Sequence, residues 1–353
     1  GVMSELTYDC RNRLTSAGNV TYTYDAEGSL TISGSRVEEA VTSAIVSAVT
    51  SDPVYVGVLT GNAVAEDRAV LESVLAANNF EVSEVDLVTG SLDAYEVLFL
   101  LAPAQDLSED TLARFDQFLY HDGQYGRTLL YAASAEQPEL SNLNVFLREW
   151  GVAVGDGAVF ETDENYAYGY QPFYPFADYT DETFRDLLKD SSKRVLMPVS
   201  KPLSLVFEAR DQKLVTTLLS FSASSGVRPS DAGSNFTVDQ ATVRGPMPAA
   251  VMSTWMPSGA DKYSNVIVSA SANAFASTTL TNTSIANAEY WISILNQITD
   301  RGDAVSIEAK SLAGNALTIT TGAARTWSIL LCIVIPAGIL LTGILVYLRR
   351  RYQ

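Results

Sequence analysis

The chain has 353 residues, a formal net charge of −18 at pH 7, two cysteines and one histidine. An acidic chain repels nucleic acid and anionic lipid headgroups, so neither class of partner is expected. Cys10 and Cys332 lie far apart in the sequence, and no Cys/His spacing is typical of a metal site. We therefore expect no disulfide framework, no metal and no cofactor.

The most informative segment lies near the C-terminus. Residues 327–348 carry no charge and precede three arginines. The hydrocarbon core of a bilayer, about 30 Å thick, needs about 20 apolar residues in a helix, so we predict a transmembrane helix over residues 326–348. The residues that anchor, kink or orient this helix are Trp327, Pro336, Gly338, Tyr347, Arg349, Arg350 and Arg351.

The arginine triplet also predicts the orientation of the chain. By the positive-inside rule, the tail 349–353 is cytoplasmic and the preceding chain lies outside the cytoplasm. All 41 acidic residues fall within the first 308 positions, in agreement with an acidic ectodomain. Export needs a signal peptide or an earlier membrane helix, and the first residues contain no apolar run. We therefore expect the chain to be part of a longer protein.

Apolar strands and amphipathic helices alternate in the first half of the ectodomain. The expected strands are 54–59, 80–87, 97–102 and 128–133, and the expected helices are 65–77, 109–120 and 142–150. This alternation is typical of a parallel sheet covered on both faces. We predict an open, doubly wound α/β unit with a mostly parallel sheet over residues 36–155.

The second half, residues 156–302, is richer in strands and continues the ectodomain. Strands are expected at 194–200, 203–208, 215–221, 249–254 and 265–270, before a helix at 286–299. Residues 303–325 predict a hairpin close to the membrane. Residues 1–35 form a separate segment.

An aromatic segment lies between the two halves. Glycine and proline interrupt it, so it cannot be a regular helix. Two interpretations stay open: a surface that contacts a partner, or an irregular loop whose rings pack onto the sheet. Its aromatic residues are Tyr166, Tyr168, Tyr170, Phe173, Tyr174, Phe176 and Tyr179.

The chain offers little for catalysis. An amide hydrolase needs a nucleophile at a strand-to-helix turn with a histidine base in reach. Ser134 follows an expected strand but lacks the Gly-x-Ser-x-Gly elbow, and His121 ends an expected helix. No phosphate-binding glycine motif is present. We expect a non-enzyme, with a Ser134–His121 pair as the remaining hydrolase alternative.

Several segments, in the same order along the chain, resemble GldG-like auxiliary proteins of ABC transporters, of the gliding-motility type. They include Ser51-Asp-Pro-Val-Tyr-Val-Gly-Val-Leu-Thr-Gly61, Leu143-Asn-Val-Phe-Leu-Arg-Glu-Trp-Gly-Val152 and Ile307-Glu-Ala-Lys-Ser-Leu312. The family often has histidine where this chain has Asn62. The resemblance covers roughly residues 36–352. It implies a non-catalytic, extracytoplasmic auxiliary subunit in a bacterial plasma membrane, with ABC permease and ATPase subunits as partners.

Two further resemblances concern shorter stretches. The doubly wound unit is similar to the class I glutamine amidotransferase-like folds. Residues 4–31 resemble two tandem YD (Rhs-type) repeats, with Leu6-Thr-Tyr-Asp9 and Tyr22-Thr-Tyr-Asp25. Two repeats are too few for a stable shell, so this segment is either a junction with another protein or a coincidence.

Two other functions remain open from the sequence. One is a sensor that binds a small ligand at the carboxyl ends of the parallel strands, near Thr60-Gly61 and Ala102-Pro103. The other is a degenerate hydrolase.

Overall fold

The computed structural model describes residues 53–60, 65–233, 235–241 and 243–301, together with four short strands near the N-terminus. The predicted hairpin at 303–325 and the predicted anchor at 326–348 lie outside the described residues. Within the part of the chain that is described, no helix is long and apolar enough to cross a membrane.

The N-terminal strands form an antiparallel sheet in the order β1-β2-β3-β4. Their bounds are Leu6–Tyr8, Leu14–Ala17, Val20–Tyr24 and Leu30–Ser35. The segment that resembles YD repeats therefore contains β-strands.

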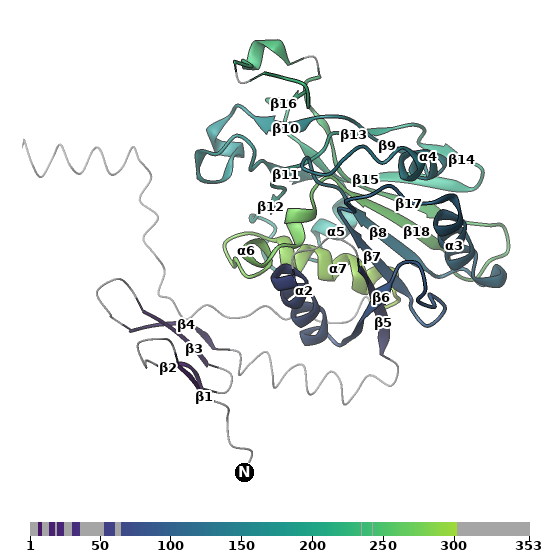
Figure 1. Cartoon of the computed structure of the whole chain (residues 1–353), viewed down its shortest axis with the longest axis horizontal. Coiled ribbons are helices and arrows are strands. Elements are labelled where there is room, and N and C mark those ends of the chain that lie inside the picture. The colour runs from purple at the N-terminus through teal and green to yellow at the C-terminus, as the bar shows by residue number, and fades with distance from the viewer. Residues whose placement is uncertain are drawn as a thin grey trace, which may run out of the picture.

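A ten-stranded sheet organises the rest of the protein (Figure 1). Its strand order is β12-β11-β15-β17-β18-β8-β7-β5-β6, with β14 paired to β15. The bounds along that order are Val195–Leu196, Phe176–Tyr179, Lys213–Phe221, Met247–Trp255, Ser264–Ser269, Thr128–Ala132, Val97–Leu101, Val54–Thr60 and Phe80–Asp86, with β14 at Ala209–Arg210.

The sheet has a parallel half and an antiparallel half. Strands β18, β8, β7, β5 and β6 pair in parallel. Strands β17, β15, β14, β11 and β12 add antiparallel pairs. Every residue of β7 and β8 is buried, as expected for strands covered on both faces. The predicted α/β class with a parallel sheet is confirmed, and the strand-rich second half supplies the antiparallel pairs.

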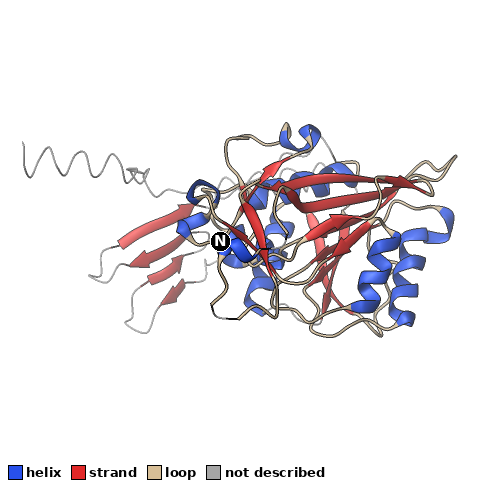
Figure 2. Ribbon diagram, turned by 90° about the horizontal axis from the view of Figure 1, so that it is seen from above, coloured by secondary structure: helices blue, strands red, loops and turns tan. Residues whose placement is uncertain are grey.

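Helices cover both faces of the sheet (Figures 1 and 2). Helices α2, α6 and α7 lie on one face, where α6 contacts the other two, and α3 and α4 pack together on the other. Their bounds are Ala65–Ala77 for α2, Ser277–Leu280 for α6, Asn287–Ile298 for α7, Glu109–Tyr120 for α3 and Ser141–Glu149 for α4.

Local signals explain where the predicted helices begin and end. The Ser108 hydroxyl accepts the Thr111 N–H at 3.2 Å and caps α3. His121 ends that helix in the left-handed conformation, with φ of 47°. Gly151, with φ of 83°, follows α4. Helices α2 and α3 match the predicted ranges, and α4 begins one residue earlier than predicted.

In the second half, β12 and β13 (Leu203–Leu205) are shorter than the predicted strands, whereas β15 and β17 are longer. The predicted range 194–200 is too long, because β12 covers only Val195–Leu196. Pro198 has no N–H to donate, and Val199 has a left-handed φ of 53°. Two small antiparallel sheets lie beside the main sheet, β9 with β13 and β10 with β16. Their bounds are Val152–Val154, Leu203–Leu205, Ala158–Glu161 and Ser225–Arg228.

The remaining described elements are short. They are α5 at Glu182–Arg185 and the 3-10 turns η1 to η5 at His121–Gly123, Glu164–Tyr166, Tyr168–Tyr170, Val238–Gln240 and Ala272–Phe275. One continuous hydrophobic core extends from Val54 to Leu295. The predicted units 36–155 and 156–302 therefore share that core.

The first strand of this α/β domain, β5, and its last described residue, Arg301, both lie where the parallel strands begin. Arg301 donates to the carbonyls of Asn78 and Asn79 at 3.2 and 3.1 Å and lies over the Phe80 ring. Phe80 opens β6 and pairs with Val54, the first residue of β5. We call the end of the sheet at which the parallel strands begin the amino edge. The end at which those strands finish is the carboxyl edge.

Candidate functional site

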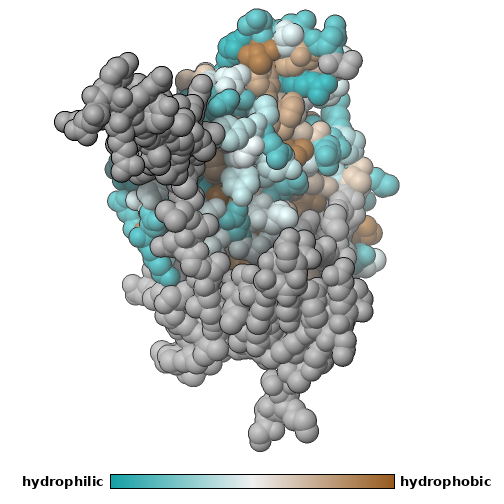
Figure 3. Space-filling model, turned by 90° about the vertical axis from the view of Figure 1, so that its left-hand side faces the viewer, coloured by the Kyte–Doolittle hydropathy of each residue, from teal (hydrophilic) through white to brown (hydrophobic). Residues whose placement is uncertain are grey.

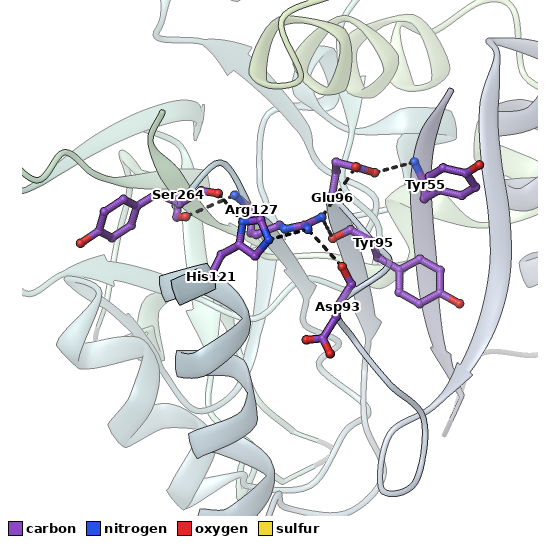
Figure 4. Close-up of polar contacts among 8 residues, drawn as sticks. Tyr55, Asp93, Tyr95, Glu96, His121, Arg127 and Ser264 are labelled. Carbon is purple, nitrogen blue, oxygen red and sulfur yellow. Dashed lines mark hydrogen bonds and ion pairs between the residues drawn. The ribbon is translucent and has the colours of Figure 1, made fainter. Parts of the chain in front are cut away.

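A polar network at the amino edge surrounds Arg127 (Figure 4). The guanidinium donates to the backbone carbonyls of Tyr95 and Asp93 and lies 3.7 Å from the Glu96 carboxylate. Glu96 in turn accepts the Tyr55 N–H at 2.7 Å. Burial lowers the pKa of Arg127, and Glu96 and Asp93 oppose that shift. These contacts connect the starts of β5, β7 and β8, so the network holds the sheet together.

His121 belongs to this network. Its Nδ1 lies 3.1 Å from the Tyr125 carbonyl and its Nε2 lies 2.9 Å from an Arg127 nitrogen. A carbonyl only accepts and a guanidinium only donates, so Nδ1 carries the proton and Nε2 accepts. The nitrogen that would serve as a base is therefore already bonded to a guanidinium.

Ser134 lies at the other edge of the sheet. It comes two residues after the end of β8, whereas His121 precedes the start of that strand. Its hydroxyl accepts the Glu136 N–H at 3.2 Å, and its own N–H donates to Gln137. The fold thus separates the two residues of the hydrolase alternative by the length of β8 instead of bringing them together.

A cavity of about 130 Å³ lies at the carboxyl edge, between the end of β8, helix α4 and β9. We call it the carboxyl-edge cavity. Its apolar wall comes from α4 and the residue before it: Leu140, Leu143 and Leu147. Its polar lining comes from separate segments: Tyr131, Gln137, Glu139, Asn144, Asp156 and Lys201. A concave site with an apolar wall and a few converging polar groups is the usual form of a small-molecule site.

Lys201 is buried in this lining, with 7% of its surface exposed. Its N–H donates to the Ala270 carbonyl at 2.9 Å, directly after β18. On either side, the Ser200 carbonyl accepts from Val159 and the Pro202 carbonyl accepts from Gly155, both at 2.8 Å. These backbone bonds fix the point from which the lysine side chain enters the cavity.

Tyr131 and Asp156 contribute groups of opposite character. Burial raises the pKa of the Tyr131 hydroxyl, so it remains a neutral donor. Hydrogen bonds from Ser230, and more weakly the charge of Lys201, hold the pKa of Asp156 below its ordinary value. The cavity therefore combines a cationic group, a neutral hydroxyl and a carboxylate.

The aromatic segment adjoins the same edge. Val199 donates to the Phe173 carbonyl at 2.9 Å and accepts from Ala135, which follows β8. Tyr166 packs under the Arg194 guanidinium at 4.4 Å. Phe173, Tyr174, Phe176 and Tyr179 are also partly buried. Tyr168 and Tyr170 are 39% and 64% exposed. The segment thus has packed rings, as one interpretation expected, and two exposed rings, as the other required.

The exposed surface viewed in Figure 3 is mixed in character. Hydrophilic and neutral residues dominate its coloured part, and hydrophobic residues appear there as scattered spots.

Asp163 and Asp181, each followed by a glutamate in the sequence, cap the short helical elements η2 and α5. Asp163 accepts the Asn165 N–H at 2.9 Å, and Asp181 accepts the Thr183 N–H at 2.8 Å. Among the described residues, no group of three His, Cys, Asp or Glu side chains is arranged to hold a metal ion.

Other residues singled out by the sequence have different outcomes. The seven anchor residues, Trp327 to Arg351, lie outside the described part. Thr60 ends β5, and its hydroxyl donates to the Val85 carbonyl at 3.2 Å, while Gly61 lies outside the described residues. Pro103 is buried at the carboxyl edge. Lys201 and Asp156 were missed, because a single lysine and a single aspartate form no sequence pattern.

Comparison with protein-family models and with curated proteins finds no match. Among solved structures, the chain is similar to the mmIFT52 N-terminal domain, with a TM-score of 0.51 and 12% sequence identity. The similarity covers 69% of this chain and 97% of that one. At this identity the likeness concerns the fold alone.

Proposed function

We propose that the chain is a non-catalytic, membrane-anchored auxiliary subunit of an ABC-type transport or envelope system. Its α/β domain lies outside the cytoplasm of a bacterial cell, and its predicted C-terminal helix packs against the permease. The proposal rests on the resemblance to GldG-like proteins and on the apolar run at residues 327–348.

The observation that carries the proposal furthest is the position of Arg301 at the amino edge. Arg301 contacts Phe80 and the carbonyls of Asn78 and Asn79 there, and the predicted anchor follows it in sequence. With the amino edge toward the bilayer, the carboxyl-edge cavity and the exposed rings Tyr168 and Tyr170 face away from it. This is the orientation that a subunit needs if it receives a ligand or partner from outside.

A non-catalytic role agrees with the geometry of the residues considered for hydrolysis. Ser134 and His121 lie beyond opposite ends of β8, and the His121 Nε2 accepts from Arg127. The strand order β6-β5-β7-β8 and the helices on both faces also support our proposal of a glutamine amidotransferase-like topology without its chemistry.

Detergent extraction of the full-length protein from its native membrane, followed by affinity capture and mass spectrometry, tests the proposal. We expect an ABC ATPase and a multi-pass permease in near-stoichiometric amounts. Capture of the protein alone would contradict the proposal.

The double variant Tyr168→Ala/Tyr170→Ala tests the exposed rings in the same capture. We expect it to recover less of at least one partner, because exposed aromatic rings supply contact energy at interfaces. Tyr263→Ala is the control for loss of an exposed ring, since Tyr263 is 48% exposed and lies near Val54 and Lys262 at the amino edge.

Ligand binding is a second candidate function, and the carboxyl-edge cavity favours it. The sequence predicted such a site near Thr60-Gly61 and Ala102-Pro103, whereas the cavity lies at the end of the next parallel strand, β8, and none of those residues lines it. Ligand binding and membership of a transport complex are compatible, because they use different parts of the molecule.

A further inference from the structure

We infer that the carboxyl-edge cavity binds a small α-amino acid as its zwitterion. The carboxylate pairs with Lys201 and Tyr131, the ammonium group lies between Asp156 and Glu139, and the side chain rests against the leucines of α4. This inference rests on the second candidate function, ligand binding at this cavity, and is independent of whether the protein joins a transporter.

The first step is the state of the Lys201 ammonium group. The residue is more than nine-tenths buried and lines the cavity. Within the described residues, no hydrogen bond or ion pair reaches its Nζ. Its charge acts on the Asp156 carboxylate, and its N–H donors remain available to an anionic group of a ligand.

The second step is preorganisation. Backbone bonds on both sides hold Lys201, and Val199, two residues earlier, has a φ of 53°. A β-branched residue rarely adopts that conformation, and such strain is found where a structure holds a neighbouring group in place. A lysine fixed in this way loses little freedom when a ligand binds.

Tyr131 adds a neutral donor to the lining of the same cavity. Its hydroxyl accepts a hydrogen bond from the Gln137 side chain at 2.5 Å. Its own proton has no acceptor among the described residues, so it is available to a carboxylate oxygen. An ammonium group and a hydroxyl give a carboxylate one partner for each oxygen.

The acids at the mouth decide between a simple anion and a zwitterion. Asp156 and Glu139 line the cavity and are exposed, and Ser230 donates to one Asp156 oxygen at 2.7 Å. A simple anion would meet these two carboxylates, and a simple cation would meet the buried Lys201. A zwitterion satisfies both signs, because it offers a carboxylate to Lys201 and an ammonium group to the two acids.

The volume limits the size of the ligand. A protein cavity of about 150 Å³ accommodates benzene, which has six non-hydrogen atoms, so the 130 Å³ here suits about that number. Alanine has six non-hydrogen atoms, and its methyl group suits the wall of Leu140, Leu143 and Leu147. Affinity for so small a ligand is expected on the order of 10 µM to 1 mM.

Isothermal titration of the full chain in detergent tests the inference with three probes. Racemic alanine carries both charges, propionate lacks the ammonium group, and ethylamine lacks the carboxylate. We expect alanine to bind at least about tenfold more tightly than either of the other two, because each lacks one charged contact.

Substitutions of single residues test which side chains contact the bound alanine. We expect Lys201→Met, which keeps the aliphatic stem, and Asp156→Asn each to weaken alanine binding at least about tenfold. Tyr131→Phe should weaken it about threefold or more. Lys262→Met, at an exposed lysine of the amino edge, should leave binding unchanged. Circular dichroism and thermal unfolding identify any variant that fails to fold, and Tyr131→Phe is the smallest change.

Three results would overturn the inference. They are no heat of binding with alanine at millimolar concentration, propionate binding as tightly as alanine, and folded Lys201→Met binding alanine as well as the wild type. The capture experiment on the transport partners is independent of all three, so either idea can fail alone.

Discussion

The Asn287 side chain forms hydrogen bonds with both backbone groups of Leu196. Its Oδ1 accepts the Leu196 N–H at 2.8 Å, and its Nδ2 donates to the Leu196 carbonyl at 2.8 Å. Asn287 begins α7 and is fully buried, and Leu196 ends the short strand β12. β12 is the outermost strand of the sheet, and the Asn287 amide supplies the hydrogen bonds to Leu196 that a further strand would otherwise supply.

Replacing this amide should destabilise the fold strongly. We expect Asn287→Ala to lower the free energy of unfolding by about 2–4 kcal/mol, because it leaves buried groups of Leu196 without partners. Urea unfolding followed by circular dichroism measures the change. Asn165→Ala is the control, since Asn165 is exposed and should cost less than about 0.5 kcal/mol. Equal losses in the two variants would contradict this role of Asn287.

Two left-handed glycines allow steric crowding to be separated from backbone strain. Gly157 and Gly259 have φ of 97° and 83°. A Cβ at Gly157 would overlap the Arg228 carbonyl oxygen, whereas a Cβ at Gly259 would meet nothing within 4 Å. We expect Gly259→Ala to cost about 1–2 kcal/mol from the left-handed conformation alone.

Gly157→Ala should cost at least about 2 kcal/mol more than that, because the β10–β16 pair must move apart. Thermal unfolding of the two variants beside the wild type gives the comparison. Equal shifts in the midpoint would show that the Arg228 carbonyl moves freely and that the small sheet is not tightly packed.

Asp116 on α3 predicts a pH effect. Desolvation raises its pKa above the ordinary 3.8, Glu149 acts in the same direction, and Lys213 opposes them. A raised folded-state pKa means that the protonated carboxyl group stabilises the fold. That stability is complete below 3.8 and is lost as pH rises through the folded-state pKa.

Asp116→Asn should therefore be more stable than the wild type at pH 7, and the difference should vanish when the pH falls below about 3. Urea unfolding at both pH values tests this sign. Asp211→Asn serves as the control, because the Asp211 side chain is 82% exposed. A stability gap of the same size at both pH values would count against the prediction.

The proposed orientation predicts which edge lies nearer the bilayer. Single cysteines at Lys262, on the amino edge, and Glu139, on the carboxyl edge, can be labelled after Cys10 and Cys332 are replaced by serine. We expect energy transfer from the label to acceptors on lipid headgroups to be clearly greater for position 262. Both side chains are exposed, so labelling should not disturb the fold. Greater transfer from position 139 would reverse the orientation.

The parallel half of the sheet could be predicted well because its signals are local. Strands β7 and β8 are continuous apolar runs. Ser108 marks the start of α3, which follows β7, and Gly151 marks the end of α4, which follows β8. The end of β12 could not be predicted, since Asn287, which holds Leu196, lies far along the chain.

The candidate site was less accessible to sequence reasoning. Lys201, Tyr131 and Asp156 meet only because β8, β9 and the segment before β13 converge, and no short motif contains two of them. The structure does not bring Ser134 and His121 together, because closeness in the sequence does not imply closeness in the fold. Thirteen positions separate the two residues in the sequence, yet the sheet places them at opposite edges.

The position of Arg301 has a mechanical consequence. A pull on the chain beyond this residue would enter the domain through its bonds to Asn78 and Asn79, beside the first pairs of β5 and β6. The force would then act on the segment between α2 and β6 and on the start of β5, at the amino edge. A force on the chain beyond Arg301 would therefore act first at the end of the strands opposite the carboxyl-edge cavity.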